Sequence, residues 1–167
     1  MKINLEFNNT TKNKFSKKFF ADIAAETLLE SGMECLEEKK IELSVALVDE
    51  KEISRLNFEY RKKNRPTDVL SFCEYEKKEA VCEDKRENIF LGELVVCPGY
   101  IAEISKQEKE PLEYSMRYIV SHGILHLLGF GHGKKMFSLQ TQVADTLEIK
   151  PVAHERQVKK QKLCKMN

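Results

Sequence analysis

The sequence predicts an α+β fold with α/β-like features, in which a single domain holds a small mixed sheet of about four strands covered by helices. Short segments with alternating or continuous apolar residues interleave with longer segments whose apolar residues recur at helical spacing. A chain of 167 residues suffices for one substantial core and not comfortably for two. Its 41% hydrophobic and 33% charged residues are typical of a globular protein, and no apolar run reaches the roughly 18 residues that span a membrane.

Strands are expected at residues 2–8, 40–48, 67–74 and 90–97. The first shows alternating Ile3, Leu5 and Phe7, which is the pattern of a strand and not of a signal peptide. The second is rich in β-branched residues and the fourth is mostly apolar. These segments supply the expected sheet.

Helices are expected at residues 13–33, 50–61, 99–107, 111–129 and 136–147. The first carries apolar residues at near-helical spacing and is closed by Gly32, since glycine readily takes the left-handed conformation that ends helices. Pro111 suits the first helical position of the fourth helix because its fixed φ fits a helix start. This helix is expected to lie beside a cleft, with a polar strand connection and the 61–68 loop on the opposite wall.

Two segments are predicted to lie outside regular structure. Residues 76–88 are almost wholly polar and link two expected strands, which is typical of a mobile connection. Residues 1–148 form the expected domain, and residues 149–167 form a basic C-terminal extension that is disordered or helical only when bound. The cations of the extension are Arg156, Lys159, Lys160, Lys162 and Lys165. Most charge runs of this kind simply form a solvated surface.

The cysteines indicate a reducing compartment such as the cytoplasm. They are Cys35, Cys73, Cys82, Cys97 and Cys164. Their odd number and the absence of a C-x-x-C pair argue against a disulfide framework and against a thiolate zinc site. Most are therefore expected to be small core residues.

His122, His126 and His132 form the pattern that says most about function. Residues four apart lie on the same face of a helix, so His122 and His126 can direct imidazole nitrogens at one ion. Gly129 lets the chain leave the helix and curl back, and Gly131 adds freedom before the third histidine. Three imidazoles leave a fourth tetrahedral position open, as in catalytic zinc sites, which predicts one Zn²⁺ per chain.

The spacing H-x-x-x-H-x-x-G-x-x-H also occurs in metzincin proteases, where a glutamate general base follows the first histidine. Here that residue is Gly123, so the proton acceptor of peptide hydrolysis is missing. The alternative of ordinary helix-surface histidines without a metal is disfavoured, because three of the four histidines fall in one short window with glycine at the bend.

Three segments together resemble the YbeY family of ribosomal-RNA maturation endoribonucleases. They are residues 122–132 (HGILHLLGFGH), 56–72 (LNFEYRKKNRPTDVLSF) and 91–97 (LGELVVC), and their order and spacing agree with the family. The resemblance implies a zinc-dependent, single-strand-selective endoribonuclease that acts in ribosomal RNA maturation and ribosome quality control. It further implies RNA as substrate and ribosomal proteins or assembly GTPases as candidate partners.

Two positions depart from the family pattern. The family usually has aspartate before its third histidine and proline after the Ser-Phe pair, where this chain has Gly131 and Cys73. Neither change removes an expected ligand. Loss of the aspartate removes a charge or hydrogen bond that orients a histidine, and such losses weaken metal affinity by about 10–100-fold.

Arg61 is the expected phosphate contact. It begins a window with Lys62, Lys63 and Arg65 that concentrates positive charge although the net charge is only +1. A guanidinium binds phosphate with two parallel hydrogen bonds and can stabilise the charge of a transition state. The family resemblance also implies a functional arginine here. The alternative is a surface arginine that merely follows an amphipathic helix.

Zinc in such a site can activate water or act as a Lewis acid on a phosphoryl oxygen. RNA carries its own nucleophile, the 2′-hydroxyl, so a ribonuclease tolerates Gly123 better than a protease does. Thr67 and Asp68 are expected to orient the loop before the third strand. Glu93 and Glu113 are candidate acceptors for the free N–H of a ligand histidine, and His154 is expected to be an ordinary residue of the extension.

Two further functions stay open on the sequence. One is a metallohydrolase of another substrate class, suggested by the metzincin-like spacing. The other is a ribosome assembly factor whose metal mainly stabilises the fold, in which case removal of the metal would unfold the protein.

Overall fold

The computed structural model describes residues 1–147, so the predicted extension and His154 lie outside the described residues. Four strands form one sheet in the order β1-β2-β4-β3. Strands β1 (Lys2–Asn9), β2 (Lys40–Leu47) and β4 (Asn88–Val96) are parallel, and β3 (Val69–Cys73) is an antiparallel edge strand paired with β4. The predicted mixed sheet of an α+β fold is therefore confirmed.

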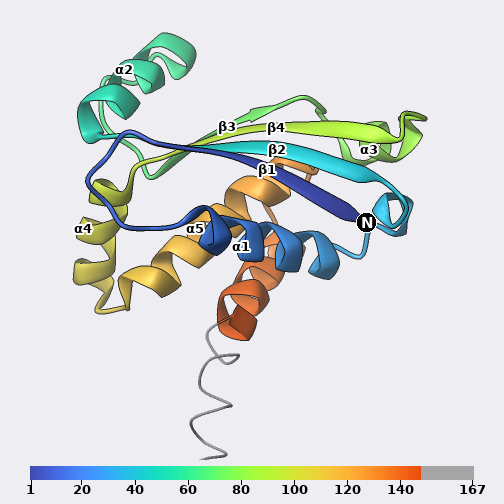
Figure 1. Ribbon diagram of the computed structural model, residues 1–167. Coiled ribbons are helices and arrows are strands. Elements are labelled where there is room, and N and C mark those ends of the chain that lie inside the picture. Colours follow the sequence, from blue (N-terminus) through green and yellow to red (C-terminus); the bar gives the residue numbers. More distant parts are fainter. Residues whose placement is uncertain (148–167) are drawn as a thin grey trace, which may run out of the picture.

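Helices cover the sheet unevenly. Helices α1 (Lys17–Glu30) and α5 (Leu112–Leu127) lie on one face, and α2 (Glu50–Arg61) lies beyond the other face at one end (Figure 1). The remaining helical segments are a 3-10 turn (Glu34–Leu36), α3 (Lys78–Glu83), α4 (Pro98–Glu108) and a final helix over 134–147. Within residues 1–147, no helix combines the length and the apolar character needed to cross a bilayer.

The core lies between the sheet and α1 and α5. Strand alternation turns Leu5, Leu43 and Leu94 inward, where each is at most 3% exposed. From α5, Val120 and Ile124 enter the same cluster with no exposed surface. This packing fixes α5 against β3 and β4, and so fixes the position of any side chain near its carboxyl end.

Three element boundaries differ from prediction for local reasons. Helix α1 begins at Lys17 and not at residue 13, because Ser16 Oγ accepts a hydrogen bond from the Phe19 N–H as an N-cap. Pro111 precedes α5 in an extended conformation and is not its first helical residue. The polar connection at 76–88 contains the short helix α3, whose Val81 is fully buried.

Cys35 and Cys82 form a disulfide, which shows that the expectation against disulfides was wrong. Cys35 lies shortly before β2 and Cys82 shortly before β4, and these neighbouring parallel strands start in register at Lys40 and Asn88. The sheet thus brings the two segments together, with a Cα–Cα separation of 5.4 Å. The odd number of cysteines and their spacing in the sequence could not reveal this disulfide, because it depends on β2 and β4 being neighbours in the sheet.

Candidate metal centre

The three predicted ligands meet at the carboxyl end of α5. One ligand atom of each of His122, His126 and His132 lies within 4.8 Å of the others. The Nε2 atom of His126 is 3.1 Å from that of His122 and 3.2 Å from that of His132. Two nitrogens bound to one zinc at tetrahedral angles lie about 3.3–3.4 Å apart, so the triad has the spacing of a metal site.

Gly129 returns the chain to the triad, as predicted. Its φ of 79° is left-handed, and its N–H donates to the carbonyl of His126 at 2.9 Å. A second constraint was not visible in the sequence: a Cβ on Gly129 would lie 2.4 Å from backbone atoms of Lys77 and Lys78. The turn therefore needs glycine both for its conformation and for the close approach of α3.

Two of the three histidines are oriented by hydrogen bonds at Nδ1, the ring nitrogen that faces away from the triad. His126 Nδ1 lies 3.1 Å from the Phe130 carbonyl, and His122 Nδ1 lies 2.8 Å from Oε1 of Gln140. Both partners are oxygen acceptors, so each Nδ1 carries the proton and each Nε2 presents its lone pair to the centre of the triad. Gln140 is only 1% exposed and comes from the final helix.

Gln140 replaces the acceptors that the sequence suggested. Glu93 instead accepts a hydrogen bond from Ser44 Oγ at 3.3 Å, and Glu113 pairs with Arg117 at 3.3 Å. The expectation that these glutamates orient a ligand was wrong. Gln140 lies eighteen residues beyond His122, too far along the chain for any spacing rule to connect them.

The electrostatic environment favours the neutral form of His126. Burial foremost, and then the neighbouring His122 and His132, lower the pKa of His126 to about 4. At neutral pH this imidazole is therefore unprotonated, which is the form that binds metal. Arg61 makes the smallest contribution to the lowered pKa of His126, which indicates that its charge lies within electrostatic reach of the triad.

Gly123 does not face the triad. A Cβ there would lie 2.9 Å from Leu94 of β4 and 3.4 Å from Ser71 Oγ of β3. The position that holds the protease glutamate in metzincins is thus pressed against the sheet. A longer side chain would force α5 away from β4, so the fold itself opposes a general base at this point.

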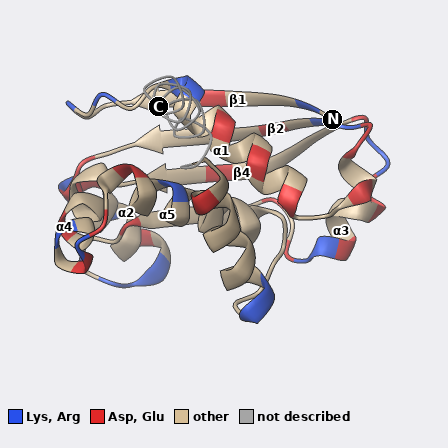
Figure 2. Cartoon of the chain, turned by 90° about the horizontal axis from the view of Figure 1, so that it is seen from below, with Lys and Arg blue, Asp and Glu red and all other residues tan. Residues whose placement is uncertain are grey.

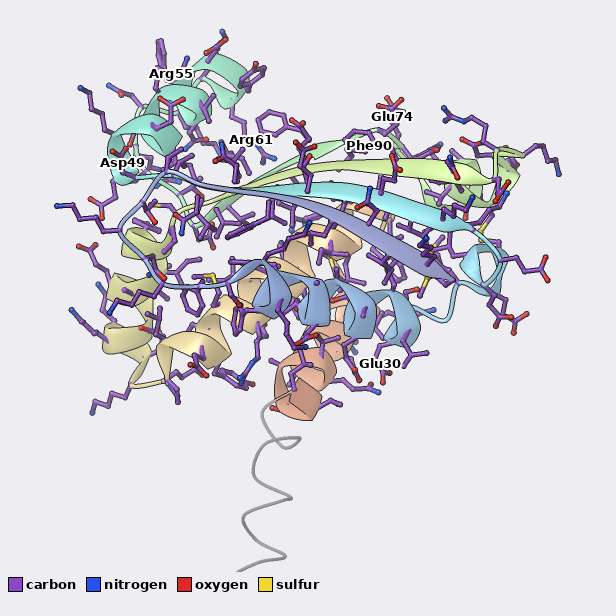
Figure 3. All side chains as sticks on the ribbon, viewed as in Figure 1. Glu30, Asp49, Arg55, Arg61, Glu74 and Phe90 are labelled. Atoms are coloured by element: carbon purple, nitrogen blue, oxygen red, sulfur yellow. A yellow bond between two sulfur atoms is a disulfide. The ribbon has the colours of Figure 1, made fainter. Side chains whose placement is uncertain are left out.

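Arg61 is the last residue of α2 and is exposed, as Figure 3 shows between α2 and the sheet. Its guanidinium makes no ion pair or hydrogen bond with any residue in the range 1–147. The following loop is held in place because the buried Asn57 donates from Nδ2 to the Arg65 carbonyl at 2.8 Å. Arg61 is therefore a positioned cation whose donors are available to a ligand.

Thr67 and Asp68 orient the start of β3, as expected. The carboxylate of Asp68 accepts from Thr67 Oγ1 at 2.9 Å and from the Val69 N–H at 2.8 Å. At the other end of β3, Cys73 Sγ contacts the His126 carbonyl at 3.4 Å. The strand thus connects the arginine loop to the metal helix.

Lysines from two other segments lie near the triad. Lys78 Nζ lies 4.6 Å from the ring centre of Phe130, and Lys135 Nζ lies 5.9 Å from it. Lys77 and Lys134 are exposed beside them. Figure 2 shows a blue, basic segment beside α2, whereas α3 carries both basic and acidic residues. Arg61 and these lysines place several cations near the triad, although the chain is nearly neutral overall.

Comparisons with known proteins agree with this site. The family model described as "Endoribonuclease YbeY" matches residues 6–148. Proteins named Endoribonuclease YbeY from Francisella philomiragia and Francisella tularensis subsp. novicida are 34% and 33% identical over 112 residues, which is 67% of this chain. The aligned parts span 68% and 66% of those relatives.

A solved structure has the same fold. The solution structure of TM1509 from Thermotoga maritima superimposes with a TM-score of 0.60 at 25% identity, covering 90% of this chain and 93% of that one. The family match extends over most of the chain and includes the histidine triad, Arg61 and the sheet that positions them. The chain belongs to the YbeY family.

Proposed function

We propose that this protein is a zinc-dependent, single-strand-selective endoribonuclease that acts in ribosomal RNA maturation and ribosome quality control. The observation that carries the proposal is the convergence of three imidazole Nε2 donors beside a cation, Arg61, that has no ion-pair partner within residues 1–147. The names of the family and of the relatives support RNA as the substrate.

Each residue of the site has a separate role in the proposed reaction. His122, His126 and His132 would hold the zinc, and Gln140 and the Phe130 carbonyl keep two of these rings in the binding tautomer. The bound ion supplies Lewis acidity toward a phosphoryl oxygen or activates a water molecule. Arg61 binds the scissile phosphate and stabilises its developing charge. RNA offers its own nucleophile, the 2′-hydroxyl, so a ribonuclease needs less from a protein base at position 123 than a protease does.

The test is cleavage of a labelled single-stranded RNA by the zinc-loaded protein, alongside His126→Ala, Arg61→Ala and Arg55→Ala. Arg55 is a matched control, because it lies on the same helix but is paired with Glu52 at 2.7 Å and Glu59 at 2.7 Å. His126→Ala should abolish cleavage, and Arg61→Ala should slow it by about 10²–10³-fold. Equal cleavage by all four proteins would refute the assignment.

A second candidate is a ribosome assembly factor with a structural metal, with ribosomal proteins or assembly GTPases as partners. The hydrogen bond between His122 and Gln140 favours it, since this bond links a histidine that would hold the ion to the final helix. This candidate predicts that a chelator unfolds the protein and that ribosome association survives Arg61→Ala. Both candidates act on ribosomes and therefore imply a cytoplasmic protein, whereas the Cys35–Cys82 disulfide removes the argument from reduced cysteines.

A further inference from the structure

Two exposed aromatic rings lie beside the groups assigned to catalysis. Phe137 is 46% exposed, and its ring centre lies 6.3 Å from that of His132 with only 23° between the ring planes. Tyr60 is 60% exposed and directly precedes Arg61. The two rings come from different elements, the final helix and α2.

Core packing does not account for the exposure of Phe137. Its neighbour Met136 is 1% exposed and Gln140 is likewise buried, so these residues form the inward side of the final helix. Phe137 instead lies on the outer side with His132, which is also exposed. Single exposed apolar residues are common, but this ring lies against a ligand histidine, where it is accessible to a substrate at the site.

Tyr60 is held in place although it is exposed. Its ring meets that of Phe72 edge to face, with centres 5.0 Å apart and 76° between the planes. Side chains alternate along a strand, so Phe72 lies on the face of β3 opposite Cys73, whose Sγ contacts the carbonyl of His126. The contact with Phe72 holds Tyr60 at the edge of the sheet next to Arg61, so Tyr60 is a fixed surface and not a freely turning side chain.

We propose that Phe137 and Tyr60 are base-stacking platforms, which receive unpaired bases of an RNA strand on either side of the scissile phosphate. The inference rests on the proposed function and adds the substrate contacts that select single strands. A base on Phe137 would place its ribose and phosphate beside His132, and a base on Tyr60 would place its phosphate beside Arg61. Bases inside a duplex are stacked and paired, so they cannot reach either ring.

Charge supports RNA as the occupant. Lys134 and Lys135 precede Phe137, and Lys62 and Lys63 follow the arginine beside Tyr60. All four are exposed, so each ring lies next to cations that can track a phosphate backbone. Aromatic rings interleaved with such cations are the usual means of binding single-stranded nucleic acid.

The test uses zinc-loaded protein and RNAs with 2′-O-methyl riboses, which lack the attacking hydroxyl and are therefore expected to be bound without being cut. Single-stranded RNAs carry 2-aminopurine at successive positions, since the fluorescence of this base falls when it stacks. Wild type is compared with Phe137→Leu, Tyr60→Leu and Phe137→Tyr, the last of which keeps a ring. Phe90→Leu is the matched control, because Phe90 is 39% exposed on the outer face of the sheet, the face opposite α5 (Figure 3).

Each leucine variant at Phe137 or Tyr60 should lose quenching at one RNA position and bind about 5–10-fold more weakly, the lower range for a stacked base. Phe137→Tyr and Phe90→Leu should behave as wild type. Quenching that is equal in all variants, or absent from wild type, would overturn the proposal. Stacking by wild type on these RNAs, together with no cleavage of the unmodified RNA, would instead refute the nuclease and leave the platforms supported.

Discussion

Replacing Gln140 with leucine is expected to weaken zinc binding about 10–100-fold, because this side chain sets the tautomer of His122. Its Oε1 lies 2.8 Å from His122 Nδ1, and the residue is 1% exposed, so water cannot easily replace the lost acceptor. A buried donor left without an acceptor costs about 1–3 kcal/mol. Since each tenfold in affinity corresponds to about 1.4 kcal/mol, the two estimates agree.

The measurement is zinc affinity by competition with a chromogenic chelator. Gln140→Glu keeps an oxygen acceptor and should retain wild-type affinity or exceed it. Gln142→Leu is the matched control, since Gln142 lies on the same helix but is exposed and donates to Glu30. A folded Gln140→Leu protein that binds zinc as tightly as Gln142→Leu would show that the Gln140 contact does not orient the ligand.

Three further changes test other parts of the structure. Gly92→Ala should lower the unfolding free energy by at least about 2 kcal/mol in denaturant titration, because φ is 129° and the new Cβ would lie 2.1 Å from the Phe72 carbonyl oxygen. Gly131→Ala is the control and should leave the unfolding free energy unchanged, because the space around Gly131 is open. Gly131→Asp should tighten zinc binding about tenfold by giving His132 an acceptor, and an unchanged affinity would contradict this. Reductant should lower the unfolding free energy by about 2–4 kcal/mol in wild type, given the 47-residue separation of Cys35 and Cys82, and should have no effect on Cys35→Ser.

The sheet and the convergence of the three histidines were predictable because their signals are local. Alternation in Ile3, Leu5 and Phe7 reports a face of a strand directly, and the spacing of His122 and His126 reports a face of a helix. The return of the chain toward His132 was also predictable, since glycine takes the left-handed conformation at Gly129 more readily than any other residue.

The remaining features depend on tertiary contacts. Gln140 reaches His122 only because the final helix packs against α5, and Cys82 reaches Cys35 only because β2 and β4 are neighbours. Helix α3 was missed because its sequence is polar, and a single buried residue, Val81, anchors it to the core. These contacts join segments that are far apart in the sequence, so the spacing of apolar residues within one segment cannot predict them.

The compactness of the ligand segment has a consequence for the order of folding. All three histidines lie between residues 122 and 132, so bringing them together closes only a short loop and costs little chain entropy. Arg61, in contrast, reaches the triad only after β3 has paired with β4. In a refolding chain the triad can therefore form before the sheet is complete, whereas in a chain that emerges from its N-terminus all four strands are made first.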